Sequence, residues 1–468
     1  MKLPIITTLS TAFLLFAMQM SALAQGNQVV TTTNLSLKQA QDYAVKNNAN
    51  SRNSAIDMEI AKKKIWETTA IGLPQISAQA NYQHLFTVPE LSLGGSTYLA
   101  TDLPAGTPIT SDDINNQKVY MGYTPGAPIK LGVANNTTLD ITVSQLIFSG
   151  EYLVGLQATK VYYTMTDQNR QKTEIDLKEN VSNTYAMALV FEQSRNVLNQ
   201  SLGNTNKTLA EMQEMYKQGL VENTDVDQIE LVSLTLKNAV SSMSRQIDAT
   251  YDLLKFQLGM PFADKIVLTD SLETIAGTVN LETLINTQFN INNNLDYQIL
   301  KTSEDISKLN LKREKSTYLP NLAAVYRHQE QMNAPEFNFN PKDVVQVAMN
   351  IPIASSGMRN SKVQQRKLEL QQVTNTKENM ANGLQLQYIN TRNELTTAYE
   401  KYLNDKRNIE LTKRILDKSL IKFKEGLASS RDITEFLNQY LTAQSNMYTS
   451  MLSLISAKNK LDKLNNNL

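Results

Sequence analysis

The chain carries two copies of one sequence pattern, and this internal repeat constrains its fold more than any other feature. Leu35 of the first copy matches Leu281 of the second, and Gly219 matches Gly426. The other matched positions are Asn47-Asn48 with Asn293-Asn294, Leu73-Pro74 with Leu319-Pro320, Ser149-Gly150 with Ser356-Gly357, and Asp225-Val226 with Asp432-Ile433. Repeats of this size indicate one architectural unit that is used twice. The spacing between matched positions changes after Pro74, which places an insertion in the first copy before Ser149.

The first residues have the features of a secretory signal peptide. Lys2 supplies a positive start, an apolar stretch follows from about Ile5 to Met18, and Ala22-Leu23-Ala24 fits a cleavage site. We therefore predict a signal peptide over residues 1–24 and a mature chain from about Gln25. The sequence contains no cysteine, which excludes disulfides, thiolate metal ligands and a lipid anchor at the mature N-terminus.

Charge and hydropathy exclude two further classes of protein. Lys plus Arg and Asp plus Glu are equal at 45 each, whereas a protein that binds nucleic acid through its phosphates carries a basic excess. Beyond the signal peptide, no stretch reaches the roughly 18 apolar residues that a membrane-spanning helix needs. The sequence therefore predicts neither a nucleic-acid partner nor a transmembrane helix.

Four segments alternate between apolar and polar residues with a period of two, which predicts β-strands. They are residues 75–88 and 138–148 in the first repeat, and 321–330 and 343–353 in the second. One face carries residues such as Ile76 and Ile141, and the other is rich in Gln, Ser, Asn and Thr. Strands of about 10 residues cross a bilayer when they are tilted. The alternative is a soluble antiparallel sheet with one face on a core.

The connection between the first two strands is much longer than the connection between the last two. Residues 89–137 are rich in Gly, Pro, Thr and Asn and show little periodicity, so they predict a long loop. The corresponding segment of the second repeat, about residues 331–341, is short. Outer-membrane barrels place their long loops outside the cell. We expect both connections on one side, because the other strand ends continue into helices.

Two very long helices are expected, over residues 151–217 and 360–425. Apolar residues recur in them at alternating steps of four and three, which is typical of left-handed coiled-coil packing. Shorter helices are expected over 226–258, 433–465, 36–72 and 281–317, with 259–280 as a linker in an equatorial region. Laid end to end, two shorter helices match one long helix. The lengths therefore predict a rod of four helical columns.

Each long helix is expected to end at a glycine, Gly219 or Gly426, because glycine tolerates the left-handed conformation that closes a helix. The helix that follows is expected to open with a capping box, an N-cap residue followed three positions later by Gln or Glu. The expected pairs are Asp225 with Gln228 and Asp432 with Glu435. The two tips are predicted over about residues 217–227 and 424–435.

Four strands cannot close a barrel, and unpaired strand edges are not tolerated in lipid. Closure therefore requires several chains. Two chains give eight strands, whose side chains fill the interior, whereas three give twelve and leave a lumen. The predicted fold is mainly α with a small β part. It is an internally duplicated chain that forms a trimeric membrane β-barrel, continued by a long coiled-coil α-helical barrel.

The order and spacing of several motifs resemble the TolC family of outer-membrane efflux channels over about residues 35–465. The motifs are Leu35-Ser36-Leu37-Lys38-Gln39-Ala40 with Asn47-Asn48, Leu73-Pro74, Leu319-Pro320, Ser149-Gly150, Ser356-Gly357, Gly219-Leu220 and Gly426-Leu427. The resemblance implies a homotrimer with its barrel in outer-membrane lipid and a large periplasmic tunnel. It also implies cargo delivery from an inner-membrane pump, of the RND or ABC type, through a periplasmic adaptor or membrane fusion protein.

The resemblance further implies roles for residues at the tips. Acidic residues on the return helix of the second tip narrow the periplasmic end in this family, and Asp432 and Glu435 stand at those places. Asp225 and Asp227 are the corresponding candidates at the first tip. The residues that match the adaptor-facing tips are Gly219, Leu220, Gly426 and Leu427. The tip arginine of the family has no match, because Arg431 lies several positions later.

Nothing in the sequence predicts catalysis, a metal site or a cofactor. The two histidines, His84 and His328, lie in or beside strands without a cluster of other metal ligands, and we expect them at a membrane interface or rim. The predicted function is a passive outer-membrane exit duct of a tripartite efflux or type I secretion system. The alternative is a periplasmic coiled-coil scaffold that forms no channel. Drugs, metal ions and polypeptides all remain open as cargo.

Overall fold

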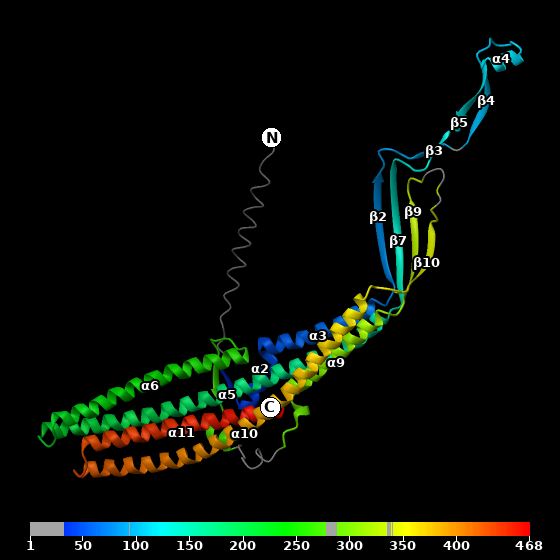
Figure 1. Ribbon diagram of the computed structural model, residues 1–468. Coiled ribbons are helices and arrows are strands. Elements are labelled where there is room, and N and C mark those ends of the chain that lie inside the picture. The colour runs from blue at the N-terminus through cyan, green and yellow to red at the C-terminus, as the bar shows by residue number, and fades with distance from the viewer. Residues whose placement is uncertain (1–31, 93, 278–287, 335–337, 339) are drawn as a thin grey trace, which may run out of the picture. The chain divides into compact units, whose positions relative to one another are not determined.

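The computed structural model describes residues 32–92, 94–277, 288–334, 338 and 340–468 (Figure 1). The predicted signal peptide, residues 1–24, lies outside this part of the chain, as do the end of the predicted linker and the start of the helix expected over 281–317. The chain divides into two compact units. Unit 1 contains the residues up to Ala61, Tyr162–Asp305 and Gln371–Leu468, and unit 2 contains Lys62–Val161 and Ile306–Leu370.

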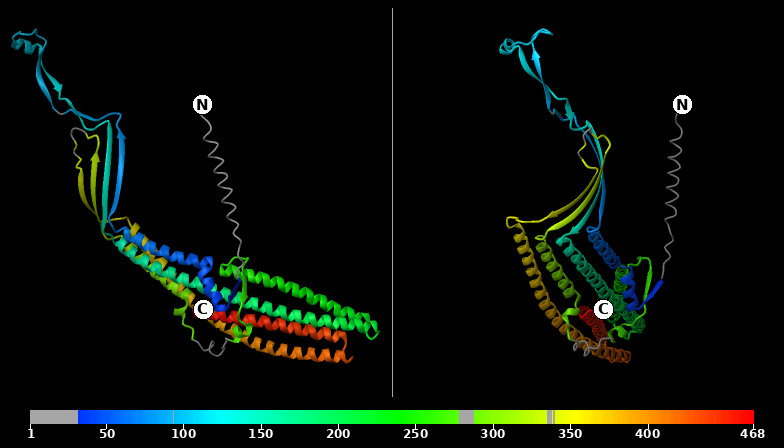
Figure 2. Two further views of the ribbon diagram at one scale, coloured as in Figure 1. Left: turned by 180° about the vertical axis from the view of Figure 1, so that it is seen from behind. Right: turned by 90° about the vertical axis from the view of Figure 1, so that its right-hand side faces the viewer.

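Four long helices supply most of unit 1. They are α5 (Gly150–Lys217), α6 (Asn223–Leu258), α10 (Met358–Lys424) and α11 (Ser430–Leu464). Helices α5 and α10 begin in unit 2. The expected heptad schedule is visible in what they bury, since Leu384, Tyr388, Thr391, Leu395 and Ala398 of α10 follow one another at steps of four and three and are all buried. Figure 2 shows α5 with α6 and α10 with α11 as two helical hairpins. No described helix is apolar enough over sufficient length to span a membrane.

Apolar side chains from both hairpins meet in shared cores within unit 1. One cluster contains Val232 and Leu236 of α6, Leu416 of α10 and Leu437 of α11, with Leu198 of α5 packed against it. In a larger cluster, the middle of α5 packs against short elements close to the first described residues of the chain. The two hairpins are therefore joined by side-chain packing as well as by the chain.

The helices expected over 36–72 and 281–317 differ from the prediction, and in each an asparagine marks the difference. The segment 36–72 forms α2 (Leu37–Asn47) and α3 (Ala49–Ala70), because Asn48 leaves the helical conformation and its side chain accepts a hydrogen bond from Asn50 N. In the second repeat α9 spans only Leu295–Ser316, and the described residues before it form a 3-10 turn, η1 (Ile291–Asn293). Asn294 Oδ1 accepts from Tyr297 N at the start of α9.

The same two asparagines attach these helices to the ends of α6 and α11. Asn48 Nδ2 donates to Gln257 O at 2.8 Å, and Asn294 Nδ2 donates to Leu464 O at 3.1 Å. Asn294 is 4% exposed, so its amide would otherwise be buried without a partner. Each short helix is thus held against the end of one returning helix.

A small parallel sheet and one tyrosine fix the middle of α5. Strand β1 (Thr32–Leu35) pairs with β8 (Lys265–Leu268), and the short helix α7 (Leu272–Gly277) follows β8. Tyr185 of α5 is fully buried; its hydroxyl donates to Leu35 O at 2.9 Å and accepts from Asp270 N at 3.2 Å. The expected linker 259–280 is therefore structured over its described residues.

Unit 2 contains a four-stranded antiparallel sheet in the order β10-β9-β7-β2 (Figure 1). The strands are β2 (Gln75–His84), β7 (Asn135–Phe148), β9 (Asn321–Gln331) and β10 (Asp343–Asn350). β7 and β9, from different repeats, are neighbours at the centre of the sheet. Strand β2 ends at His84, four residues before the expected end.

The segment 89–137, expected as a long loop, is mostly a continuation of the β2–β7 hairpin. Strand β3 (Glu90–Ser92) pairs with β6 (Pro128–Lys130), and β4 (Gly95–Thr101) pairs with β5 (Val119–Pro125). The short helix α4 (Ser111–Asn115) lies at the end. The loop prediction was wrong because Gly and Pro, which suggested irregular structure, here interrupt a two-stranded ribbon without ending it.

Candidate functional site

The four-stranded sheet of unit 2 has one continuous apolar face. Because residues opposite one another in neighbouring strands share a face, Ile76, Val143, Tyr326 and Val345 form one row across the sheet. Ile76 and Val345 are both 75% exposed. Nothing in the described part of the chain covers this face, so it is an apolar surface on a single protomer.

The opposite face of the same sheet is polar in β2 and β7 and mixed in β9 and β10. Gln79, Asp140 and Gln329 form one row, in which Gln329 Nε2 donates to Asp140 Oδ1 at 2.8 Å. Gln331 Nε2 donates to Asn136 Oδ1 at 2.7 Å in the next polar row. The alternation read from the sequence is therefore in register from strand to strand.

Both edges of this sheet are open. β2 pairs only with β7 and β10 pairs only with β9 within the described residues. An open edge presents a row of unpaired N–H and C=O groups, which lipid does not tolerate. A sheet with this pair of faces and these edges needs further strands before it can be placed in a bilayer.

A repeated hydrogen-bond motif, which the sequence reading missed, joins each strand pair near its connecting end. Tyr82 Oη and His84 Nδ1 both contact Asn135 Oδ1, at 3.0 and 2.7 Å. In the second pair, Tyr326 Oη and His328 Nδ1 both contact Asp343 Oδ1, at 2.7 and 2.8 Å. The signal was present as Tyr-x-His in both repeats. It was missed because the two histidines are not at matching repeat positions.

The two tips of unit 1 have the same backbone geometry. Gly219 and Gly426 have φ of 72° and 74°, in the left-handed region. Leu220 N donates to Met215 O, and Leu427 N donates to the corresponding carbonyl of the second tip, at 2.9 and 2.8 Å. With the hydrogen bonds from Gly219 N and Gly426 N, each tip is a Schellman motif. Leu220 and Leu427 are exposed at the turns, at 64% and 73%.

The capping boxes differ from those expected by three positions. Helix α6 has Glu222 as N-cap with Asp225 at the third helical position, and α11 has Ser429 as N-cap with Asp432 at that position. Asp225 and Asp432 are therefore the carboxylates that reach back to the cap, not the caps themselves. The expectation failed because Asp is itself a common N-cap, whereas Ser429 begins the helix one turn earlier.

The acidic residues at the tips have different surroundings. Hydrogen bonds from the backbone N–H and the hydroxyl of Ser429, together with the charge of Arg431, hold the pKa of Asp432 below its usual range. Asp227 accepts from Asn223 Nδ2 at 2.9 Å within its own helix. Glu435 accepts from a glutamine one turn along α11. Asp432, Asp227 and Glu435 are exposed.

Among the four predicted gate residues, Asp225 contacts the other tip. The hydroxyl of Ser430, the first residue of α11, donates to Asp225 Oδ1 of α6 and lies 3.3 Å from Gln228 Oε1. Ser430 is 3% exposed and Asp225 is half-buried. Of the four predicted gate residues, the structure therefore brings one into a contact between hairpins and leaves three in contacts within their own helices.

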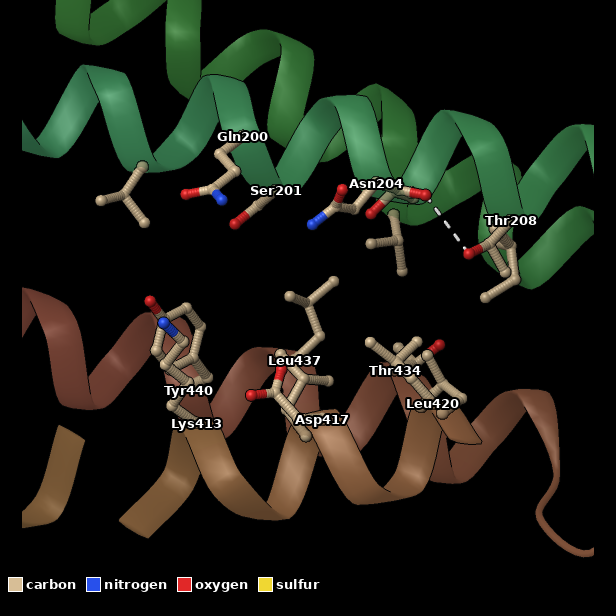
Figure 3. Close-up of a pocket in the computed structure, with 16 residues that line it drawn as sticks. Gln200, Ser201, Asn204, Thr208, Lys413, Asp417, Leu420, Thr434, Leu437 and Tyr440 are labelled. Carbon is tan, nitrogen blue, oxygen red and sulfur yellow. Dashed lines mark hydrogen bonds between the residues drawn. The ribbon is translucent and has the colours of Figure 1, made fainter. Parts of the chain in front are cut away.

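A cavity of about 130 Å³ separates the two hairpins behind the tips (Figure 3). Gln200, Asn204 and Thr208 of α5 face it from one side, and Lys413 and Asp417 of α10 face it from the other. Its remaining lining is mostly apolar and comes from all four helices. The cavity therefore lies beside the apolar cluster of Val232, Leu416 and Leu437 that joins the two hairpins.

No group of three His, Cys, Asp or Glu side chains is arranged to hold a metal ion in the described residues. The carboxylates of Asp225, Asp227, Asp432 and Glu435 make hydrogen bonds at caps, along helices or between the tips. Nothing in their arrangement resembles a nucleophile paired with a base.

No protein-family model matches the chain, and a search of curated proteins found no match. Solved structures do match over most of its length. VceC, an outer-membrane protein of Vibrio cholerae, aligns with a TM-score of 0.66 at 12% identity and covers 92% of this chain and 96% of its own. The CmeC outer-membrane channel of Campylobacter jejuni gives 0.67 at 14%, covering 92% and 86%.

The open state of the MtrE outer-membrane channel of Neisseria gonorrhoeae aligns with a TM-score of 0.66 at 14% identity, covering 92% of this chain and 88% of that one. These matches include both the strands and the long helices. They agree with the resemblance drawn from the sequence motifs. The chain therefore has the fold of the TolC-like outer-membrane efflux channels.

Proposed function

We propose that this chain is the outer-membrane channel component of a tripartite efflux or type I secretion system. It acts as a passive exit duct, without catalysis, for substrates that an inner-membrane pump delivers through a periplasmic adaptor. The observation that carries the proposal is the sheet of unit 2. It has an apolar face, a polar face and two open edges, and these three properties together call for a closed barrel in lipid.

Three chains complete the barrel. Four strands from each give twelve, enough to enclose a lumen lined by the polar row of Gln79, Asp140 and Gln329. The exposed apolar residues of the helices support the same assembly. Leu231 and Phe256 of α6 are 65% and 67% exposed, and Leu386 of α10 is 59% exposed. Contacts between such unlike helices of neighbouring chains form a ring that closes at three.

The proposed assembly uses the internal duplication of the chain. We infer two structural repeats, residues 25–258 and 281–468, each contributing two strands and two tip helices. The matched contacts of Asn48 and Asn294 support this inference, because each amide binds the end of the returning helix of its own repeat. The two Schellman tips support it in the same way. A trimer of chains with two similar repeats contains six similar units, so its wall has approximate sixfold symmetry.

The tips form the periplasmic end in this proposal. The channel narrows at this end, and its lining includes Asp225, Asp227, Asp432 and Glu435. Carboxylates from three chains repel one another and favour the open state, so direct contacts are needed to keep the channel closed. The hydrogen bond from Ser430 to Asp225 is such a contact. The adaptor binds the exposed turns, for which Gly219, Leu220, Gly426 and Leu427 supply the surface.

The proposal is tested with the mature protein expressed in a Gram-negative host. We expect it to leave the outer membrane only with detergent, to have the mass of three chains by native mass spectrometry, and to give conducting steps in planar bilayers. In-cell crosslinking from Leu220 or Leu427 should capture a periplasmic adaptor. A protein that is released as a soluble monomer by osmotic shock would support the scaffold alternative and refute the channel.

A further inference from the structure

We propose that the cavity between the two hairpins of unit 1 binds a small uncharged molecule, one that carries a hydroxyl group on an apolar body of about the size of phenol. The site, called here the hairpin cavity, lies within a single protomer. Binding therefore does not depend on the proposed trimer. The inference starts from two buried hydroxyl groups of α5, those of Ser201 and Thr205.

These two hydroxyl groups lack partners within the protein. Ser201 and Thr205 are both 7% exposed, and both line the hairpin cavity. Figure 3 shows the Ser201 side chain directed from α5 toward the opposite hairpin. Neither hydroxyl makes a hydrogen bond with any described residue, whereas Thr208 and Thr434 each donate to a carbonyl one turn earlier in their own helix. A buried hydroxyl without a partner costs free energy, so a ligand that supplies the partner is favoured here.

The wall that faces these hydroxyl groups is apolar. It includes Val232 of α6, Leu416 of α10 and Leu437 of α11, all of them buried. Water placed against this wall would lack most of the polar partners that a buried water needs. A ligand with an apolar body and one hydroxyl suits both walls. Its hydroxyl can donate to one of Ser201 and Thr205 and accept from the other, because residues four apart lie on one helix face.

The volume and the charge of the hairpin cavity limit the ligand further. The volume of about 130 Å³ is close to the roughly 150 Å³ of an apolar protein cavity that binds benzene. Lys413 and Asp417 line the cavity as exposed residues of opposite charge, so no net charge favours an ion. Burial and the charge of Asp417 raise the pKa of Tyr440, so this lining phenol is also neutral. Gln200 and Asn204 are exposed, which gives a ligand access from solvent.

A bound molecule would contact all four long helices and therefore both hairpins. Ile229 and Ile433 line the cavity within the first two turns of α6 and α11. The contact between Ser430 and Asp225 lies in these same turns. A ligand shifts an equilibrium toward the arrangement that it binds better. In the proposed channel, an occupied cavity should therefore favour the closed tips, and this consequence alone rests on the proposed function.

Binding is tested with the full mature protein in detergent, by fluorine NMR titration with para-fluorophenol. Fluorobenzene is the matched probe without the hydroxyl, and detergent without protein gives the background. Ser201→Ala and Thr205→Val each remove one hydroxyl and keep most of the side-chain volume. Thr250→Val is the matched control variant, because Thr250 is buried, does not line the cavity, and donates to Gln246 O of its own helix.

We expect one saturable site per chain for para-fluorophenol. Ser201→Ala and Thr205→Val should each weaken this binding about fivefold, the effect of one lost hydrogen bond, and should not weaken the binding of fluorobenzene. Thr250→Val should bind para-fluorophenol as the natural protein does. The absence of saturable binding, or equal binding of para-fluorophenol by all the variants, overturns the site.

Single-channel recordings separate the failure of this inference from the failure of the proposed function. At a concentration of para-fluorophenol that half-saturates the natural protein, its open fraction should fall, and that of Ser201→Ala should fall less. Thr250→Val should respond as the natural protein does. Channels that bind the probe and keep their open fraction overturn the effect on the tips. A protein that binds the probe but never conducts supports the site and overturns the proposed channel.

Discussion

Ser430→Ala should loosen the contact between the two tips of each protomer. The substitution removes the hydroxyl that donates to Asp225 Oδ1 from the other hairpin, while the methyl group keeps most of the packing of a side chain that is 3% exposed. A hydrogen bond of this kind contributes about 1 kcal/mol net. Because Asp225 is half-buried, water can replace the lost donor. The cost should therefore not exceed this value by much.

The effect depends on whether the three proposed protomers open together. One contact of about 1 kcal/mol changes the ratio of closed to open channels about fivefold. Three contacts that break in one step correspond to about 3 kcal/mol, which changes the ratio by roughly 10². Single-channel recordings in planar bilayers, at fixed voltage and salt, measure the open fraction and distinguish these two magnitudes.

Ser429→Ala is the matched control. The substitution removes the hydrogen bonds that the Ser429 hydroxyl makes with the Asp432 carboxylate and with Asp432 N, at a cost to α11 of roughly 1 kcal/mol. It leaves the contact between Ser430 and Asp225 in place. We expect its open fraction to match the natural protein. The reasoning fails if Ser430→Ala stays within twofold of the natural protein, or if both variants open the channel equally.

Three further predictions address the fold and the membrane. Gly259→Ala should lower the melting temperature more than Gly426→Ala: left-handed strain of about 1–2 kcal/mol applies to both, but only at Gly259 would the new Cβ lie 2.6 Å from a backbone oxygen. Val347→Arg, on the apolar face of β10, should cost about 2–4 kcal/mol in lipid and reduce the yield of detergent-extracted trimer, whereas Gln346→Arg on the polar face should leave the yield unchanged. Asp432→Asn should lower the melting temperature at neutral pH, measured by circular dichroism. The difference in melting temperature from the natural protein should disappear as the pH falls through the depressed pKa of Asp432, because the carboxylate stabilises the helix only while it is ionised.

The parts of the fold that follow from periodicity could be predicted from the sequence. The strand around Ile76 has a strict period of two, the strand around Val345 keeps it more weakly, and the buried series through Leu395 keeps the heptad spacing. In both cases one repeated local rule determines the structure over a long segment. The register between strands was not read from the sequence, yet it aligns the faces that the alternation defined.

The parts that failed depend on competition between single residues. Asn48 interrupts a segment with a helical pattern because its side chain replaces helical backbone hydrogen bonds. Asp432 looked like a cap because several residue types can start a helix, and Ser429 competes for that place. The contact between Ser430 and Asp225 joins residues far apart in the chain, and no local pattern could predict it.

The buried hydroxyl of Tyr185 gives α5 a fixed point, from which the rest of the helix extends to the tip. Tyr185 is held by Leu35 O and Asp270 N, and the helix continues from it for 32 residues to Lys217. At 1.5 Å per residue this arm is about 48 Å long, so a rotation of roughly 5° about the tyrosine displaces Lys217, with the helices packed on α5, by about 4 Å. A small rotation of α5 beside the β1–β8 pair thus moves the tip by more than the diameter of a water molecule, while every helical hydrogen bond stays intact.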